Sequence, residues 1–334
     1  MKRAFVLVGI IAAGTVAMVA AQQAPAGRGG GGAPGGQAPA GGRGGTPAPP
    51  QLQLERVRPG VYQIPIFNQS VAPGATTTVF VTENHGVVIV DTKNPGSGQA
   101  IIEMVKKVTD KPITTIINTH THNDHVGGNL AFDDKVEIVA QENTLGYMKK
   151  LDQFKDEKPE NMKGLPDKTF KDKMTLFEGP DVIDLYFFGP AHTGGDTFVV
   201  FRNQKVMAAG DVDPATGTPI IDPDNGGSGL LWGQTIAKAA AGIKNVDVVT
   251  RGHTSQTDNW AQFIEYGQYM QAYADATRAA KKAGKTLEEA IADVPMRMGP
   301  KYKDYFSGLS GRNPGTKANV TMMWAELDKE APKK

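Results

Sequence analysis

Histidine is the residue type in this sequence whose placement most clearly suggests chemistry. Five of the six histidines fall in three short runs, THTHNDHVGG at 119–128, GPAHTGGD at 189–196 and RGH at 251–253. Each run directly follows a segment with the composition of a β-strand, and loops at strand ends are where α/β proteins build their sites. The three runs therefore predict one site, supplied by His120, His122, His125, His192 and His253.

The spacing within the first run suits two metal ions. Residues two apart in an extended segment point the same way, so His120 and His122 can reach one ion at about 2.0 to 2.1 Å from each ring nitrogen. Asp124 and His125 follow at once, in a loop where side chains can turn toward a second point. The glycines at 127–128 let the backbone turn sharply there. One segment thus offers half of the ligands for each of two ions.

Both ions would need further ligands from elsewhere in the chain. A catalytic zinc has three protein ligands and an open position. The chain has no Cys, so disulfides, thiolate ligands and a Cys nucleophile are excluded and the ligands must be His, Asp or Glu. His192 and His253 are the available histidines. Asp211 ends another predicted strand, and its two carboxylate oxygens could bridge both ions.

The elements that position the first run are predicted from short β-branched segments. Strands are expected at 57–66, 76–81, 86–91 and 113–118, with a hairpin turn at 83–86. Between them, apolar residues at helical spacing predict a helix over 97–108, with Ser97 as its candidate cap. His85 lies in the hairpin turn with no evident partner, so we expect it to be a surface group rather than a ligand.

The second half of the chain repeats this arrangement. Strands are expected at 170–177, 182–189, 197–201, 206–209 and 246–250, and helices at 231–244, 260–282 and 287–293. Thr286 and Glu289 form a candidate capping box for the last helix. Residues 78–91 and 197–211 look like one hairpin written twice, which suggests two pseudo-equivalent halves. The charged stretch at 149–173 is expected to be a solvated surface loop.

The first 50 residues differ in composition from the rest. Lys2 and Arg3 precede an apolar run that ends in small residues, so residues 1–21 are predicted to be a secretory signal peptide, with an uncleaved membrane anchor as the alternative. Residues 22–50 are built mostly from Gly, Pro, Ala and Gln and predict a disordered tether. The protein is therefore expected to be exported, either periplasmic or secreted, without stable membrane insertion after cleavage.

Charge argues against a nucleic-acid partner. The first 50 residues hold four of the 36 cationic residues and none of the 35 acidic ones, so residues 51–334 carry 32 cations against 35 acids and a formal net charge of −3. Nucleic-acid binding needs a basic surface to neutralise phosphates. A small-molecule substrate is the partner that we expect, and the oligomeric state is left open.

Four motifs together resemble the metallo-β-lactamase superfamily: HxHxDH at 120–125, GxxHTxGD around His192, the Gly-Asp at 210–211 and the Gly-His at 252–253. They occur in the order found in that family, over about residues 57–253. The resemblance implies a four-layer αββα sandwich of two pseudo-equivalent halves, with extra C-terminal helices, as the catalytic domain at 51–334. It also implies two divalent ions, with zinc expected and iron or manganese as alternatives.

The resemblance also implies a role for each site residue. His120, His122 and His192 would hold the first ion, and Asp124, His125 and His253 the second, with Asp211 bridging both. Asp91 resembles the family's aspartate that steadies the histidine loop. A water between the ions, its pKa lowered toward ~7, would give a hydroxide that attacks an ester, lactone, thioester or lactam, while Asp124 would orient this nucleophile and move its proton.

The ligand set favours one branch of the family over others. Dedicated β-lactamases generally lack the bridging aspartate and many use a cysteine, whereas this chain has Asp211 and no Cys, as in the glyoxalase II, lactonase and thioesterase branches. Three alternatives remain open. They are a β-lactamase proper, an oxidoreductase of the persulfide dioxygenase type with one iron, and a non-catalytic exported binding module.

Overall fold

The computed structural model describes residues 53–65, 74–215, 219–303, 305 and 315–330. Residues 48–334 form one compact unit. The predicted signal peptide and tether lie outside the described residues, so both stay predictions. Among the helices that the structure describes, none combines the length and apolar character needed to cross a bilayer.

The unit contains two β-sheets. Sheet 1 has seven strands in the spatial order of the chain: β1 (Glu55–Arg58), β2 (Val61–Ile64), β3 (Thr77–Val81), β4 (Val87–Val90), β5 (Ile113–Ile117), β6 (Glu137–Gln141) and β7 (Lys168–Phe170). Sheet 2 has six strands in the order β13 (Asp258–Asn259), β12 (Val248–Thr250), β11 (Val206–Ala208), β10 (Phe198–Phe201), β9 (Ile183–Tyr186) and β8 (Lys173–Leu176).

Helices connect these strands and follow them. The first half contains α1 (Gly98–Lys106), α2 (Asn123–Val126), α3 (Glu142–Met148) and α4 (Pro159–Met162). The second half contains α5 (Gly229–Gly242), α6 (Trp260–Lys282), α7 (Leu287–Met298) and α9 (Gly315–Glu330).

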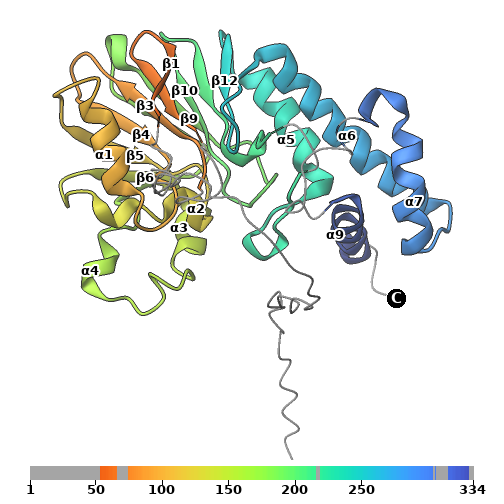
Figure 1. Cartoon of the computed structure of the whole chain (residues 1–334). Coiled ribbons are helices and arrows are strands. Elements are labelled where there is room, and N and C mark those ends of the chain that lie inside the picture. Colours follow the sequence, from red (N-terminus) through yellow and green to blue (C-terminus); the bar gives the residue numbers. More distant parts are fainter. Residues whose placement is uncertain (1–52, 66–73, 216–218, 304, 306–314, 331–334) are drawn as a thin grey trace, which may run out of the picture. The chain divides into compact units, whose positions relative to one another are not determined.

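Three apolar clusters hold the layers of this unit together. Side chains from both sheets, such as Val90 and Phe201, form the cluster between the sheets. The outer face of sheet 1 packs on α1 through residues such as Ile101, and the outer face of sheet 2 packs on α5 and α6 through residues such as Trp232. Read from left to right, Figure 1 shows α1, sheet 1, sheet 2 and then α5 and α6. The predicted four-layer αββα sandwich is confirmed.

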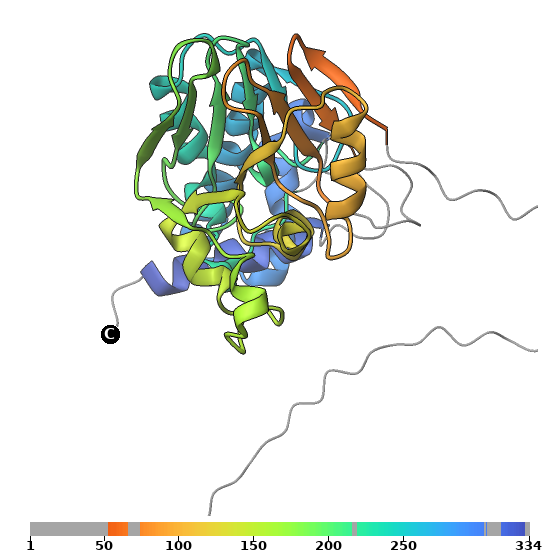
Figure 2. The same cartoon turned by 90° about the vertical axis from the view of Figure 1, so that its left-hand side faces the viewer.

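The two halves share one connection pattern. Strands β3 and β4 pair antiparallel, and after α1 the chain returns as β5, parallel to β4. Strands β10 and β11 likewise pair antiparallel, and after α5 the chain returns as β12, parallel to β11. In the view of Figure 2, α1 and α2 lie near the viewer while α6 and α7 lie behind the sheets. The repeat expected from the two similar hairpins is therefore present in the fold.

Two predicted strands are wrong as single elements. The segment at 57–66 contains the turn between β1 and β2, where Gly60 has a φ of 75° that favours glycine. The segment at 170–177 is split between β7 and β8, which belong to different sheets. The periodicity of a strand continues across such a turn, because it reports burial and not the sheet to which a residue belongs.

The charged stretch at 149–173 is more ordered than expected. It contains α4 and β7, and Phe154 and Leu165 are buried in a small apolar cluster with Val126 and Met148. A solvated loop was predicted because charged residues far outnumber these few apolar side chains in the stretch. No prediction was made for β6, α3 or α9.

The observed helix boundaries match the predicted ones in some helices and differ in others. Helix α6 spans the predicted 260–282, and the capping box of Thr286 and Glu289 is present at the start of α7. Helix α7 continues to Met298, past the predicted end at 293, with Pro295 inside it. Ser97 occupies the N-cap position of α1, but its side chain makes no capping hydrogen bond.

Candidate metal centre

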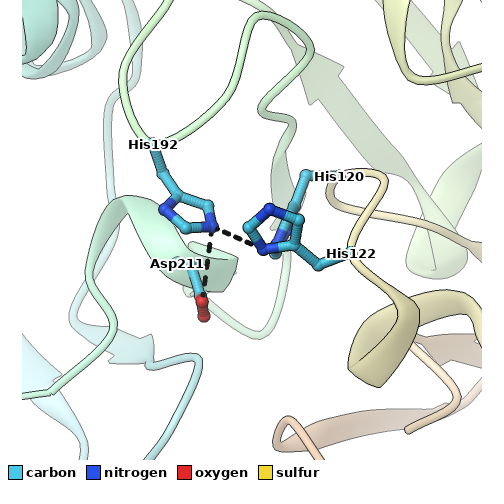
Figure 3. A group of neighbouring side chains, drawn as sticks. All are labelled: His120, His122, His192 and Asp211. Atoms are coloured by element: carbon cyan, nitrogen blue, oxygen red, sulfur yellow. Dashed lines mark hydrogen bonds and ion pairs between the residues drawn. The ribbon is translucent and has the colours of Figure 1, made fainter. Parts of the chain in front are cut away.

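The structure brings all seven predicted site residues to one edge of the sandwich, although they come from separate loops. Within the described residues, two groups have ligand atoms that all lie within 4.8 Å of one another. We call them cluster A, formed by His120, His122, His192 and Asp211, and cluster B, formed by Asp124, His125 and His253. Figure 3 shows the four side chains of cluster A converging from different loops.

The partner of His192 decides which of its ring nitrogens faces the cluster. Its Nδ1 lies 2.6 Å from the backbone oxygen of Ile220, and a carbonyl oxygen can only accept a hydrogen bond. Nδ1 therefore carries the proton of the neutral ring, and Nε2 presents a lone pair to cluster A. Burial of the ring lowers the pKa of His192 to about 4, which keeps the imidazole neutral at pH 7.

His122 presents its other nitrogen. Its Nε2 lies 2.6 Å from Oδ2 of Asp222. Hydrogen bonds from His122 and Asn225 outweigh the effect of burial and hold the pKa of Asp222 below its usual range, so this carboxylate is ionised and accepts. The Nδ1 of His122 is left to face Nε2 of His192 at 3.0 Å, as the dashed line in Figure 3 shows.

Two imidazole nitrogens that face each other through lone pairs need a positive charge between them. A shared proton would have to charge a cluster of three histidines. Burial and the neighbouring histidines already lower the pKa of His120 well below its usual value, which disfavours such a proton. A metal cation would satisfy both lone pairs at once.

His120 completes the nitrogen set. The Thr119 hydroxyl donates to Asp91 and lies 3.1 Å from Nδ1 of His120, so its oxygen is free to accept from that nitrogen. The Nε2 of His120 is buried without a hydrogen-bond partner among the described residues. A buried nitrogen without a partner carries a desolvation cost, which coordination of a metal ion would offset.

In cluster B, carboxylates surround two histidines. His125 Nδ1 lies 2.7 Å from Asp91, and its Nε2 lies 3.5 Å from Nε2 of His253. Burial of His125 opposes its protonation, but Asp211 and Asp91 raise its pKa well above the usual value. That negative field favours any cation at this point. Asp124 Oδ2 lies 3.5 Å from His253 Nε2, with a third of the Asp124 side chain exposed (33%).

Asp211 belongs to cluster A and also contacts the histidines of cluster B. Its Oδ2 is 2.9 Å from His253 and 3.6 Å from His192, and its Oδ1 is 3.3 Å from His125. Burial opposes ionisation, but His253 and His125 hold the pKa of Asp211 well below its usual value. A side chain at Gly252 would meet Oδ1 of Asp211 at 1.9 Å, so glycine is required there to make room for the carboxylate.

This donor set fits the two predicted ions. Neutral imidazoles and carboxylates are the ligands that zinc and similar divalent ions take in proteins without thiolates. The inward nitrogens are selected by hydrogen bonds on the outward ones, an arrangement that metal-binding histidines commonly show. His120, His122 and His192 could hold one ion and Asp124, His125 and His253 the other, with Asp211 placed between.

Asp91 holds the histidine loop at three points, as the sequence suggested. Its carboxylate accepts from the Thr119 backbone N–H at 2.8 Å, from the Thr119 hydroxyl at 2.6 Å and from His125 Nδ1 at 2.7 Å. The residue adopts a positive φ of 62°, which is uncommon for an aspartate and turns the side chain back under the loop.

Two partners of the site were missed by sequence reasoning. Asp222 and the carbonyl of Ile220 contact His122 and His192 from a segment with no strand or helix periodicity. The signal that could have found Asp222 is the sequence DPDNGG, in which an aspartate before a proline caps a short turn. Nothing in the sequence marks a backbone carbonyl as a partner.

Three other acidic or histidine residues lie outside the clusters. Asp196 accepts from the backbone and hydroxyl of Thr193, and Asp213 pairs with Arg251, so both aspartates have structural partners. The expectation that His85 has no partner is wrong. Its Nδ1 lies 2.8 Å from the buried Asp181, and its ring stacks on Phe177, because residues far apart in sequence meet at that end of the sandwich.

Comparison with known proteins agrees with this fold. The chain is 21% identical to a metallo-β-lactamase from Pontibacter korlensis, covering 66% of this chain and 99% of that one with a TM-score of 0.55. The DIM-1 metallo-β-lactamase is 17% identical, covering 68% of this chain and 98% of that one with a TM-score of 0.53. At these identities the likeness concerns the fold.

A curated relative and a family profile extend the comparison. The alpha subunit of a 2,4-dinitroanisole O-demethylase from Nocardioides sp. (strain JS1661) is 25% identical over 195 residues, which are 55% of this chain and 51% of that protein. The chain thus spans about half the length of this relative. The profile described as the metallo-beta-lactamase superfamily matches residues 71–271, a stretch that includes both clusters. The chain belongs to the metallo-β-lactamase superfamily.

Proposed function

We propose that the protein is a dinuclear metallohydrolase that cleaves an ester, lactone, thioester or lactam bond. Membership of the superfamily supports a metal-dependent hydrolase or a related activity. The observation that carries the metal part is the 3.0 Å approach of His122 Nδ1 to His192 Nε2, each with its other nitrogen already hydrogen-bonded.

The exposure of the side chains distinguishes residues that could only bind a metal ion from residues that could also contact the attacking water. Asp211 (4%) and His125 (0%) are closed off from solvent, so they suit ligation only. Asp124 (33%) and His253 (29%) are accessible on the open side. When bound, two divalent ions supply an activated water at neutral pH and a positive charge for the developing oxyanion. We assign to Asp124 the role of orienting that water and accepting its proton, which its exposure supports.

The carboxylate at position 211 guides the choice of substrates. An Asp in this position with no Cys in the chain favours the ligand set of the glyoxalase II, lactonase and thioesterase branches. The curated relative is an O-demethylase subunit, so a methyl aryl ether also belongs in any substrate panel. We expect the ester, lactone and thioester substrates to be turned over faster than the β-lactam.

The test joins metal analysis to that panel. Purified protein is stripped with a chelator, reloaded with zinc, manganese or iron, and assayed on esters, lactones, thioesters, a β-lactam and a methyl aryl ether. Two ions per chain and metal-dependent hydrolysis are expected. A single iron with oxygen uptake would replace the hydrolase by an oxidoreductase. A fully loaded protein that hydrolyses nothing would point to a binding module.

We also propose that the chain is exported. The apolar run behind Lys2 and Arg3 and the small residues before Gln22 support this. Expression of the whole chain in a bacterial host, followed by fractionation and N-terminal sequencing, should give a mature protein that begins at Gln22. A product that keeps Met1 and stays in the membrane fraction would favour the uncleaved anchor.

A further inference from the structure

Helix α9 lies outside the stretch that the superfamily profile matches, yet it packs into the same unit as the site. The profile ends at residue 271, whereas α9 covers Gly315–Glu330. Val320 and Met323 are fully buried in the helical core with side chains of α5 and α6. Figure 1 shows α9 beside the lower ends of α5, α6 and α7. The helix also makes polar contacts with the segment that carries partners of the site histidines.

The first polar contact is at residue 319. Asn319 is fully buried, and its Nδ2 donates to the backbone oxygen of Pro219 at 2.6 Å. Pro219 directly precedes Ile220, whose carbonyl oxygen accepts from His192 Nδ1. One side chain of α9 thus holds the peptide next to the one that selects the inward nitrogen of His192.

The second contact lies about two turns further along the same face of the helix, at residue 326. The Ser228 hydroxyl and the Gly229 backbone N–H, at 2.9 Å, both donate to the carboxylate of Glu326. This places a negative charge at the N-terminus of α5, where the helix dipole favours it. Helix α9 therefore holds segment 219–229 at both of its ends.

Between these two ends, the segment packs tightly on the loop that carries His192. Asp222 donates its backbone N–H to the His192 carbonyl at 3.0 Å, while its side chain holds His122. A side chain at Gly227 would meet the same carbonyl oxygen at 2.2 Å, so there is no slack between segment and loop. A shift of segment 219–229 would move both imidazoles.

We propose that α9, through Asn319 and Glu326, positions His122 and His192 and thereby sets the metal affinity of cluster A. This inference rests on the proposed function only in that cluster A binds a metal. Asn319 and Glu326 are positioning residues because they touch neither the substrate nor the clusters.

The test uses two variants with matched controls on the same helix. Asn319→Leu keeps the side-chain volume but removes the donor, and Glu326→Gln keeps the shape but removes the charge. Thr321→Ala and Glu330→Gln are the controls, because Thr321 is exposed and Glu330 pairs only with Arg278 among the described residues. All four are made in the full chain.

Three readouts distinguish positioning from simple stability. In metal-free protein, the imidazole nitrogen resonances of His122 and His192 should shift in both variants and stay unchanged in both controls. Metal affinity, measured by competition with a chromophoric chelator, should fall by about 3- to 10-fold, less than the 10- to 100-fold typical of direct partners of a ligand. The visible spectrum of the cobalt-loaded protein should change as well.

The outcomes separate this inference from the proposed function. Lower thermal stability with unchanged imidazole resonances and unchanged metal affinity would overturn the inference and leave α9 a packing element. Shifted resonances and weakened metal binding in a protein that hydrolyses no substrate would support the inference while removing the hydrolase. A wild-type protein that binds no metal would overturn both.

Discussion

The two halves of the sandwich supply the site in different ways. Sheet 1 delivers His120, His122, Asp124 and His125 on one continuous run, whereas sheet 2 delivers His192, Asp211 and His253 on three separate loops. The first set is ordered by contacts close in sequence and by Asp91, and it has one long-range partner, Asp222, at His122. The second set depends on segments that meet only when the chain folds. The same type of site can thus be assembled locally or at long range.

Local contacts dominate in the first half. The backbone N–H groups of His125 and Val126 both donate to the His122 carbonyl, which closes the turn of α2 around the ligands. Asp91 then holds Thr119 and His125 from below. Few partners are needed, because the order of the ligands is already written in six consecutive positions.

In the second half, a buried ion pair joins two ligand-bearing loops. Arg251 Nε donates to Asp213 at 2.8 Å, and both residues are buried. Burial raises the pKa of Asp213 above its usual value against the opposing effect of Arg251. Asp213 follows Asp211, and Arg251 precedes His253, so the pair fixes the separation of two strand ends. Burial of such an ion pair has a desolvation free-energy cost, and its contribution here is to fix the distance between the two loops.

Removal of Asp211 should give the largest effect on this comparison. Asp211→Ala leaves both clusters without their shared carboxylate, so we expect loss of at least one ion per chain and more than about 100-fold of the activity, above the usual effect of indirect partners. Metal analysis and kcat/KM check this. A variant that keeps two ions and full activity would contradict the bridging role.

Replacement of Asp91 should break the local half. Asn tolerates a positive φ, so Asp91→Asn tests the charge and not the backbone. An amide keeps only one of the two oxygens, so at least one of the three accepted hydrogen bonds loses its acceptor and His125 loses its negatively charged partner. Metal affinity should therefore fall by about 100-fold, at the upper end for such partners. Competition titration measures the change. The exposed Asp110→Asn should leave it unaltered.

Replacement of Asp222 should have a smaller effect, because it removes only the long-range partner of His122. Asp222→Asn weakens the hold on His122, while His192 keeps its bond to Ile220, so we expect about 10-fold weaker metal binding. Its matched control is Asp224→Asn in the same turn, where the side chain is exposed. An Asp222 variant no weaker than this control would show that His122 needs no outer partner.

The smallest effect on activity is expected at the opposite end of the sandwich. Asp181 accepts from Glu83, Asn84 and His85, and these bonds outweigh burial and lower its pKa below 3.8. Its stabilising contribution is therefore full above about pH 4 and lost as the pH falls through the folded-state pKa. Asp181→Asn should cost about 1–3 kcal/mol at pH 7 with activity unchanged.

Denaturant unfolding at pH 7, 5 and 3 checks the last prediction. The difference in unfolding free energy between wild type and Asp181→Asn should shrink at the lowest pH, where the wild-type carboxyl begins to take up a proton. The exposed Asp172→Asn serves as the control. A difference that stays constant with pH would mean that the charge of Asp181 does not matter to stability.

Much of the fold could be predicted because its signals are local. The helix at Trp260–Lys282 has an apolar stripe and a capping box at its N-terminus, and its bounds were predicted to the residue. The hairpin at β1 and β2 was not predicted, because the residues on both sides of Pro59 and Gly60 have the composition of one continuous strand. Helix α9 was missed because its contacts, and not its sequence pattern, hold it in place.

The sequence by itself determined the types, order and local spacing of the candidate ligands and, by its lack of Cys, restricted them to His, Asp or Glu. Only the tertiary structure decided which nitrogen of each imidazole faces inward. That choice is made by Ile220, Asp222 and Asp91, since a histidine ring offers two nitrogens and the hydrogen bond on one leaves the other free. These partners lie far away in the sequence, so only the folded chain brings them together.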